Sequence, residues 1–165
     1  MFIIIIITFM YYIASDHGGF EIKNNLIPLL RNQGIHLVDL GPTQLVEVDD
    51  YPLFAFDLAK EVAKDVFTNK GILMCKTGAG MVIAANKVKG IRAAEAYSIK
   101  EVELSRQHND ANILVLSQIE LNYELYTQLI LKWLKTPFSF EERHLRRLKE
   151  ITDYEGSEFS MPKLP

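Results

Sequence analysis

The chain has few residues that could cross-link it or divide it into parts. Cys75 is the single cysteine in 165 residues, so no internal disulfide can form and the fold needs no oxidising compartment. No repeat and no linker rich in glycine, proline or serine interrupts the sequence, so we expect a single domain over residues 1–165. An excess of one charge is also missing, because the net charge is −3. This balance gives no general attraction to nucleic acid or to acidic membranes.

The longest apolar run lies at the N-terminus, over residues 1–14. It is shorter than the about 20 residues of a membrane-spanning helix, and no Lys or Arg precedes it as in a secretory signal. Its Ile, Phe and Tyr content favours a buried first strand over Phe9–Ser15, preceded by a hydrophobic leader over residues 1–8. Residues 152–165 are expected to form a C-terminal tail. We therefore expect a cytoplasmic protein with no membrane partner.

The remaining sequence alternates between apolar runs and helix-like stretches. We predict strands over Phe9–Ser15, Ile35–Leu40, Gly71–Cys75, Ile91–Glu95 and Asn112–Leu116. Helices are predicted over Phe20–Asn32, Pro52–Val66, Ile99–Arg106, Leu121–Leu134 and Glu141–Ile151, and another follows Gly78-Ala79-Gly80 and runs through Lys87. Pro28 should kink or interrupt the first of these helices. Unbroken apolar strands alternating with helices indicate an α/β fold with a five-stranded parallel sheet covered on both faces.

Polar residues gather at the predicted ends of these elements. Ligands bind at the carboxyl ends of strands in an open parallel sheet, and we place three groups there: Asp16 and His17; Cys75, Lys76 and Thr77; His108 and Asn109. A glycine-containing turn, Gly78-Ala79-Gly80, leads into a helix start that favours anions. Arg143 and Arg147 are four residues apart and share one side of the last helix. Together these groups suit a reaction on a phosphorylated substrate.

Each of these residues also has a simpler interpretation when it is considered alone. Cys75 could be an inert buried thiol, Asp16 a helix N-cap and His108 a helix-end residue. The glycine turn lacks the complete dinucleotide and Walker patterns. Cys75 and His108 could instead serve a thiol hydrolase, which would form a covalent acyl intermediate. Nucleic-acid binding is not favoured, because the basic cluster is single and lacks interleaved aromatic residues.

Six stretches resemble one known family. IASDHGGFEIK, DDYP, GILMCKTGAGM, IAANKVKGIRAA, LSRQHNDANILVLS and ERHLRRL are similar, in the same order from about Tyr12 to Ile151, to ribose-5-phosphate isomerase B. That family also includes galactose-6-phosphate isomerases. The resemblance implies a Rossmann-like three-layer sandwich that needs no metal or other cofactor. It also implies a homodimer, or a dimer of dimers, with the active site at the subunit interface.

The resemblance also implies a role for each candidate residue. Cys75 would be the base that moves a proton between C2 and C1 of ribose 5-phosphate or ribulose 5-phosphate, through an enediolate in the pentose phosphate pathway. Thr77 and the backbone N–H groups of Gly78, Ala79 and Gly80 would stabilise that enediolate. His108 would open the sugar ring. Asn109 would donate or accept a hydrogen bond with the substrate, and Asp16 would bind sugar hydroxyls or assist ring opening. The phosphate would be held by His17, Arg143 and Arg147. The helix start and Lys76 are expected to lower the pKa of the Cys75 thiol.

Five positions depart from the family pattern. Lys76 stands at the usual glycine of the loop, Glu141 and Glu142 replace two glycines, and Ile119 replaces a phosphate-binding arginine. Pro28 in the first helix is also unusual. Because the base and the ring-opening histidine are retained, we expect an active isomerase with an altered phosphate pocket. Two alternatives stay open: an isomerase for another aldose phosphate, such as a six-carbon sugar 6-phosphate, and a weakened subunit that only binds sugar phosphate.

Overall fold

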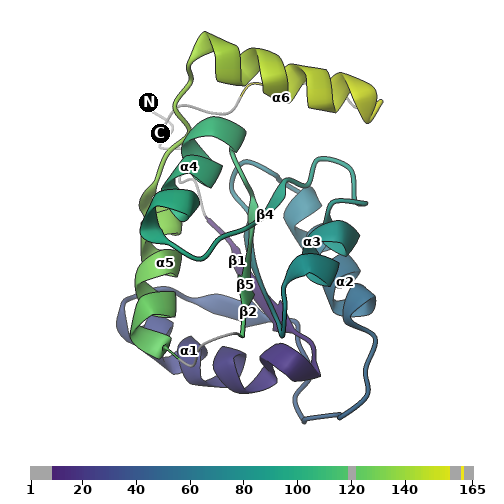
Figure 1. Ribbon diagram of the computed structural model, residues 1–165, viewed down its shortest axis with the longest axis vertical. Helices are drawn as coiled ribbons and strands as arrows, with labels where there is room; N and C mark the ends of the chain where they lie inside the picture. Colours follow the sequence, from purple (N-terminus) through teal and green to yellow (C-terminus); the bar gives the residue numbers. More distant parts are fainter. Residues whose placement is uncertain (1–8, 119–121, 157–160, 162–165) are drawn as a thin grey trace, which may run out of the picture.

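One parallel sheet forms the centre of the protein. The computed structural model describes residues 9–118, 122–156 and 161. Within them, five strands pair in the order β2-β1-β3-β5-β4, all parallel (Figure 1). The strands are β1 (Tyr11–Ser15), β2 (Leu37–Asp39), β3 (Lys70–Cys75), β4 (Ala93–Glu95) and β5 (Ile113–Ser117). The predicted five-stranded parallel sheet is confirmed.

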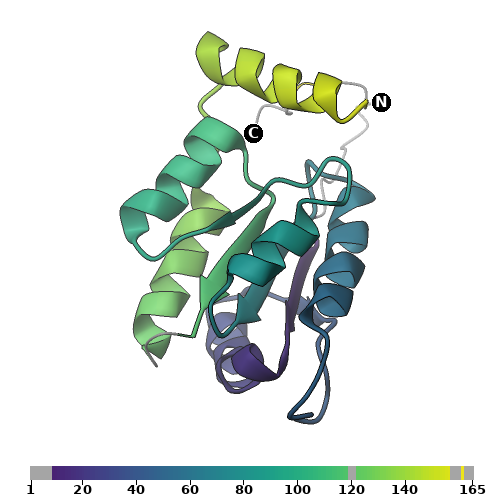
Figure 2. The same cartoon turned by 45° about the vertical axis from the view of Figure 1, so that its right-hand side comes forward.

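Helices cover both faces of the sheet. They are the short 3-10 helix η1 (His17–Gly19), α1 (Phe20–Asn32), α2 (Tyr51–Ala63), α3 (Ala79–Ala85), α4 (Ile99–Asn109), α5 (Tyr123–Lys135) and α6 (Glu142–Tyr154). Helices α1, α4 and α5 pack on one face, and α2 and α3 on the other (Figures 1 and 2). Helix α6 lies beyond the end of α4, across one end of the layers. The arrangement is the three-layer sandwich that was predicted.

The strands are apolar on both sides because each side meets a different helical layer. In β1, Ile13 belongs to the core under α1 and α5, whereas Tyr12 and Ala14 belong to the core under α2 and α3. The same alternation in β3 places Met74 in the first core and Cys75 in the second. Successive side chains of a strand point to opposite faces, so a strand covered on both faces reads as an unbroken apolar run.

The parallel strands give the sheet two functionally different edges. We call the ends of the strands at Ser15, Asp39, Cys75, Glu95 and Ser117 the carboxyl edge, and their starts the amino edge. The strand order reverses between β1 and β3, because the chain moves to β2 on one side of β1 and to β3 on the other. Ligands in open α/β sheets bind at such a reversal on the carboxyl edge. Ser15 of β1 and Cys75 of β3 end their strands there.

Some of the predicted details are corrected. Helix α1 runs through Pro28 without interruption, its apolar side buried against the sheet, so the predicted break is wrong. Helix α4 continues to Asn109 instead of ending at Arg106, and α6 continues to Tyr154, beyond the expected start of the tail. The leader over residues 1–8, Ile119 and most of the tail lie outside the described residues. Within the described ranges, every helix is too short or too polar to cross a bilayer.

Candidate active site

Cys75 and Asp16 form a buried pair where the strand order reverses. Neighbouring strands β3 and β1 end at Cys75 and Ser15, and Asp16 directly follows Ser15. The Cys75 thiol donates a hydrogen bond to Asp16 Oδ2 across 2.8 Å, while Asp16 Oδ1 accepts one from the Gly19 N–H at 3.0 Å. Cys75 is 7% exposed and Asp16 3%. The alternative interpretation of Asp16 as a helix N-cap is therefore also confirmed. One carboxylate oxygen caps η1 and the other binds the thiol.

The surroundings of Cys75 raise the pKa of its thiol. Burial is the largest cause, followed by the hydrogen bond and the negative charge of Asp16. Backbone N–H groups of Gly78 and Thr77 act in the opposite direction. The expectation of a lowered thiol pKa is therefore wrong for this chain, because burial and Asp16 outweigh the helix start. A proton acceptor is nevertheless in place, since the carboxylate already accepts the thiol hydrogen bond.

The loop after β3 turns around Cys75. Gly78 has φ +76°, a backbone conformation that favours glycine, and it precedes α3. Its N–H is one of the two that face the Cys75 sulfur, whereas Lys76, Thr77 and Ala79 are exposed. Gly80 lies against the ring of Tyr51, where an added Cβ would come within 2.7 Å of ring atoms. The backbone amides of Thr77 and Gly78 thus lie beside the sulfur.

His17 is held beside this pair by Asp49, which precedes α2. Asp49 Oδ2 accepts a hydrogen bond from the His17 backbone N–H at 2.8 Å, and Asp49 Oδ1 pairs with His17 Nδ1 at 2.5 Å. The Asp49 hydrogen bond is the main reason that the pKa of His17 is raised. Lys76 opposes this effect through its own positive charge. An imidazolium and an ammonium group therefore lie on the same side of the site, where an anion would be stabilised.

Donor atoms of Asp16, His17 and Asp49 lie within 4.8 Å of one another, which is a spacing seen around bound cations. In this structure Asp49 binds His17, and Asp16 binds the Gly19 N–H and the Cys75 thiol. The charge of Lys76 acts on the same group and opposes a cation. These partners already occupy the donor atoms, and we assign no ion to the three side chains.

His108 and Asn109 lie at the amino edge, at the opposite end of the sheet from Cys75. They are the last two residues of α4, and the chain then enters the start of β5. Cys75, in contrast, pairs with Ser117 at the end of β5. Five residues of β5 separate the two edges, a distance of about 13 Å at the usual rise per residue. The prediction that these two residues fall at a carboxyl edge is therefore wrong. A single chain does not bring His108 together with Cys75.

At the amino edge His108 stacks on a second histidine. The ring centroids of His108 and His144 are 4.3 Å apart, and His144 Nδ1 lies 2.6 Å from the Ser139 hydroxyl oxygen. His144 is 1% exposed, and burial, followed by the nearby charge of His108, lowers its pKa. The buried ring of His144 therefore fixes the position of the ring above it. His108 itself is half-buried and Asn109 is exposed.

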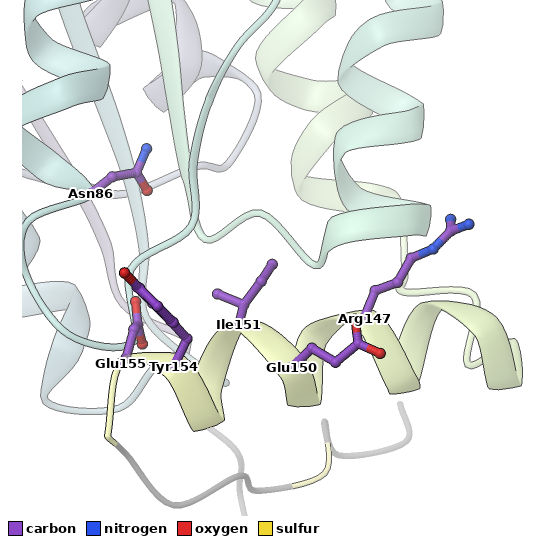
Figure 3. Close-up of a pocket in the computed structure, with 6 residues that line it drawn as sticks. All are labelled: Asn86, Arg147, Glu150, Ile151, Tyr154 and Glu155. Atoms are coloured by element: carbon purple, nitrogen blue, oxygen red, sulfur yellow. The ribbon is translucent and has the colours of Figure 1, made fainter.

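Arg143 and Arg147 project from α6 near this histidine pair. Both are exposed, and Arg143 Nε donates a hydrogen bond to Glu141 Oε2 at 2.8 Å. Figure 3 shows Arg147 and Ile151 on the side of α6 that faces the rest of the chain. The predicted site residues thus divide into two groups. Asp16, His17, Cys75 and the loop from Lys76 to Gly80 lie at the carboxyl edge, and His108, Asn109, Arg143 and Arg147 lie at the amino edge.

Comparison with known proteins shows the family of this chain. The model of the Ribose/Galactose Isomerase family matches residues 11–151. A probable ribose-5-phosphate isomerase B of Mycoplasma pneumoniae is 43% identical over 87% of this chain and 93% of its own length. A putative sugar phosphate isomerase of Bacillus subtilis is 41% identical over 87% of this chain and 95% of that protein. This chain belongs to the Ribose/Galactose Isomerase family.

Solved structures agree with this assignment. The crystal structure of ribose-5-phosphate isomerase B from Mycoplasma genitalium, with bound ribulose-5-phosphate, is 40% identical and has a TM-score of 0.86, covering 93% of this chain and all of that one. The enzyme of Trypanosoma cruzi is 40% identical with a TM-score of 0.83, covering 90% of this chain and 97% of that chain. The family resemblance and the fold inferred from the sequence are both confirmed.

Three residues of this family member were not among the predicted site residues. Asp49 belongs to the DDYP stretch, which carried part of the resemblance but no role. His144 lies between the two arginines in sequence and looked like one more charge on a solvated helix face. Glu95 ends β4, and the rule that ligands bind at the carboxyl ends of strands could have identified it. One of its carboxylate oxygens, Oε1, is buried and has no hydrogen-bond partner among the described residues.

Proposed function

We propose that this chain interconverts ribose 5-phosphate and ribulose 5-phosphate through an enediolate, with Cys75 as the base. The observation that carries the proposal is the Cys75–Asp16 pair beside the Gly78 loop, at the strand-order reversal of a Ribose/Galactose Isomerase fold. The bound ribulose-5-phosphate of the Mycoplasma genitalium enzyme supports the choice of substrate. A free thiol base is also suited to a reducing compartment, so a cytoplasmic location is part of the proposal.

The chemistry needs a proton removed beside a carbonyl and returned to the neighbouring carbon. Asp16 accepts the thiol proton as the sulfur becomes a thiolate, which then takes the proton from the substrate carbon. Backbone N–H groups of Gly78 and its neighbours Thr77, Ala79 and Gly80 stabilise the thiolate first and the enediolate oxygen afterwards. The sulfur returns the same proton to the adjacent carbon, while the hydroxyl proton of C2 passes to the oxygen on C1. Asp16 then gives the thiol proton back to the sulfur, which restores the resting Cys75–Asp16 pair. Negative charge lies first on the thiolate and then on the enediolate oxygen, and both lie close to the loop.

The separation of the two groups of residues supports a site shared between two copies of the chain. Ring opening by His108 and phosphate binding by Arg143 and Arg147 require these residues beside Cys75, and they lie at the other end of their own sheet. A second copy with the opposite orientation would supply its amino edge to the carboxyl edge of the first, and two such sites form at once. We therefore propose a homodimer, or a dimer of dimers, with active sites at the interface.

Two departures from the family pattern have proposed consequences. An added Cβ at Gly18 would come within 2.9 Å of the Lys76 Cβ, so the Lys76 side chain starts directly beside η1 and His17. We assign Lys76 to the phosphate site, where its ammonium adds to the charge of His17. Glu141 pairs with Arg143 and competes with the phosphate for that guanidinium. We therefore expect the arginine pair to contribute less to phosphate binding, and Lys76, in the loop of the facing chain, to contribute more.

The test is an isomerase assay on ribose 5-phosphate with the wild-type chain and Cys75→Ala. We expect turnover to fall by roughly 10²–10⁴-fold, the usual contribution of a general base, while substrate binding measured by calorimetry stays within about twofold. Near-normal turnover of the variant would disprove Cys75 as the base. Parallel assays with a six-carbon sugar 6-phosphate test the alternative substrate. Tight binding of ribose 5-phosphate by the wild-type chain without turnover would instead indicate a subunit that only binds sugar phosphate.

A further inference from the structure

Both carboxylate oxygens of Asp49 bind the same residue, His17. One carboxylate oxygen accepts the His17 backbone N–H at 2.8 Å, and the other pairs with His17 Nδ1 at 2.5 Å. The Asp49 side chain is only 10% exposed, whereas that of His17 is 43% exposed. A rigid, mostly covered carboxylate thus holds a ring whose other nitrogen remains open. An imidazole bound through Nδ1 has its Nε2–H left as the donor for a ligand.

The two hydrogen bonds connect separate parts of the chain. His17 begins η1, one residue after the end of β1, and Asp49 lies near the end of the segment of residues 40–50 that leads from β2 to α2. The backbone bond fixes where His17 begins its turn, and the ring bond fixes how the imidazole is rotated. A carboxylate in this relation to an imidazole orients the ring and selects its tautomer, as carboxylates do for histidine bases and metal ligands.

Three charged groups face the His17 ring. Asp49 and Asp16 favour the imidazolium and Lys76 disfavours it. The hydrogen bond that His17 donates to Asp49 has the largest effect, so the pKa of His17 lies above its ordinary value. A phosphate bound beside Lys76 would add negative charge and favour the imidazolium further. The ring therefore stays a cationic donor over a wider pH range than a free histidine, whose pKa is about 6.5.

We propose that Asp49 is a positioning residue that presents His17 to the substrate phosphate as an oriented imidazolium. This inference rests on the proposed function, in which His17 holds the phosphate of a sugar phosphate. Asp49 acts only through His17 and does not touch the reacting carbons. Its loss should therefore change the affinity for phosphorylated ligands, and it should leave the proton transfer at Cys75 unaffected.

Two substitutions separate orientation from charge. Asp49→Asn keeps an oxygen that accepts the His17 backbone N–H but removes the negative charge, whereas Asp49→Ala removes both contacts. Asp57→Asn is the matched control, because it makes the same charge change on the exposed surface of α2, in a residue paired only with Lys60 at 3.3 Å. Steady-state kinetics on ribose 5-phosphate, inhibition by inorganic phosphate and an NMR titration of the His17 ring are measured for each protein.

For Asp49→Asn we expect KM to rise roughly tenfold at pH 7.5 with kcat within about twofold of wild type, the loss expected of one hydrogen bond to a charged group. At pH 5.5, where a free imidazole is already protonated, the two KM values should agree within about twofold. The His17 resonance should titrate at lower pH in the variant. Asp49→Ala should raise KM at both pH values, because the ring loses its orientation as well as its charge.

The outcomes distinguish the failure of this inference from the failure of the proposed function. If wild-type protein does not turn over ribose 5-phosphate, the proposed function is wrong, and the NMR titration with inorganic phosphate still tests the Asp49–His17 relation. If wild-type protein is active but Asp49→Asn has an unchanged KM and an unchanged His17 titration, Asp49 is not a positioning residue. An equal fall of kcat at all pH values, with KM unchanged, would also overturn the inference.

Discussion

The two edges of the sheet differ in whether their buried polar groups have hydrogen-bond partners. At the amino edge, Asp110 Oδ2 binds Arg92 at 2.8 Å and Asp110 Oδ1 binds Arg106 at 2.7 Å. Arg106 also donates to the carbonyl oxygens of Thr136 and Ala111, and Asn112 bridges Arg92 and Gly90. Arg106 and Asp110 are buried and Arg92 is half-buried, and each has partners, as a stable interior requires. The amino edge is thus closed around a satisfied network.

The carboxyl edge leaves polar atoms without partners. Among the described residues, four buried side-chain atoms lack a hydrogen bond, and three of them belong to Ser15, Glu95 and Gln118 at or just after the ends of β1, β4 and β5. The pKa of the Cys75 thiol, at the same edge, is also raised above its ordinary value. Unsatisfied buried groups cost stability, so each one in a native protein calls for an explanation, such as a catalytic role or a bound water or ligand that completes it. The comparison teaches that the amino edge combines a satisfied buried network with the surface residues that we assign to the partner's site, whereas the carboxyl edge keeps unpaired polar atoms at its strand ends.

The division of the site between the edges gives the largest expected effect. Cys75→Ala and His108→Asn should each be nearly inactive as isolated proteins. Mixed in equal amounts and allowed to exchange subunits, they should recover about a quarter of wild-type turnover, because half of the dimers are mixed and each contains one intact site. Coupled assays before and after exchange measure the recovery. A mixture that stays inactive while mixed dimers are detected by mass spectrometry would contradict a site shared across the interface.

The sequence allowed the fold to be predicted because local and global patterns agree. Unbroken apolar strands, helical periodicity and turn residues all indicated one parallel sheet. The α-helices and strands of the structure differ from the predicted ones only in where they begin and end. Pro28 shows the limit of a local rule. Proline removes one backbone hydrogen bond, but α1 buries Ile22, Leu26 and Leu30 against the sheet, and this packing keeps the helix continuous.

The site was only partly predictable, because residue type and order do not fix distance. The stretch SRQHNDAN reads as one signature, yet the structure divides it. Arg106, Asp110 and Asn112 belong to the buried network of the amino edge, and His108 and Asn109 lie nearer the surface. The raised pKa of Cys75 depends on how deeply the sulfur is buried and on which way Asp16 points, and no pattern of residue types specifies either.

Lys70 offers a way to measure the electrostatic cost of the closed amino edge. This buried lysine begins β3, and its ammonium donates to the carbonyl oxygens of Val66, Phe67 and Asn69. Burial, aided by the charge of Arg106, lowers its pKa from 10.5 to about 8. The unfolded chain therefore binds more protons than the folded chain between about pH 8 and pH 10.5, and Lys70 should make the fold more stable as pH rises through that window.

The measurement compares urea unfolding of wild type and Lys70→Met at several pH values. The free energy of unfolding of wild type should increase relative to the variant by about 2–3 kcal/mol between pH 7 and pH 10, because one unit of pKa difference corresponds to about 1.4 kcal/mol. Other alkaline titrations cancel in the difference. Parallel stability curves for the two proteins would show that Lys70 is not desolvated in solution.

Asp16→Asn tests the carboxyl edge with a smaller effect. Removing the carboxylate leaves Cys75 buried but takes away the hydrogen bond and the charge that raise its pKa, so the thiol should ionise at lower pH. Alkylation by iodoacetamide requires the thiolate, and Cys75 is the single cysteine, so the alkylation rate against pH reports this ionisation directly. The profile of the variant should shift to lower pH, with faster alkylation near neutrality. Asp49→Asn is the control, because Asp49 binds His17 and should leave the profile unchanged. A profile for Asp16→Asn identical to that of wild type would mean that burial alone sets the thiol pKa, and the carboxyl edge would then owe its reactivity to the loop amides and not to the Cys75–Asp16 pair.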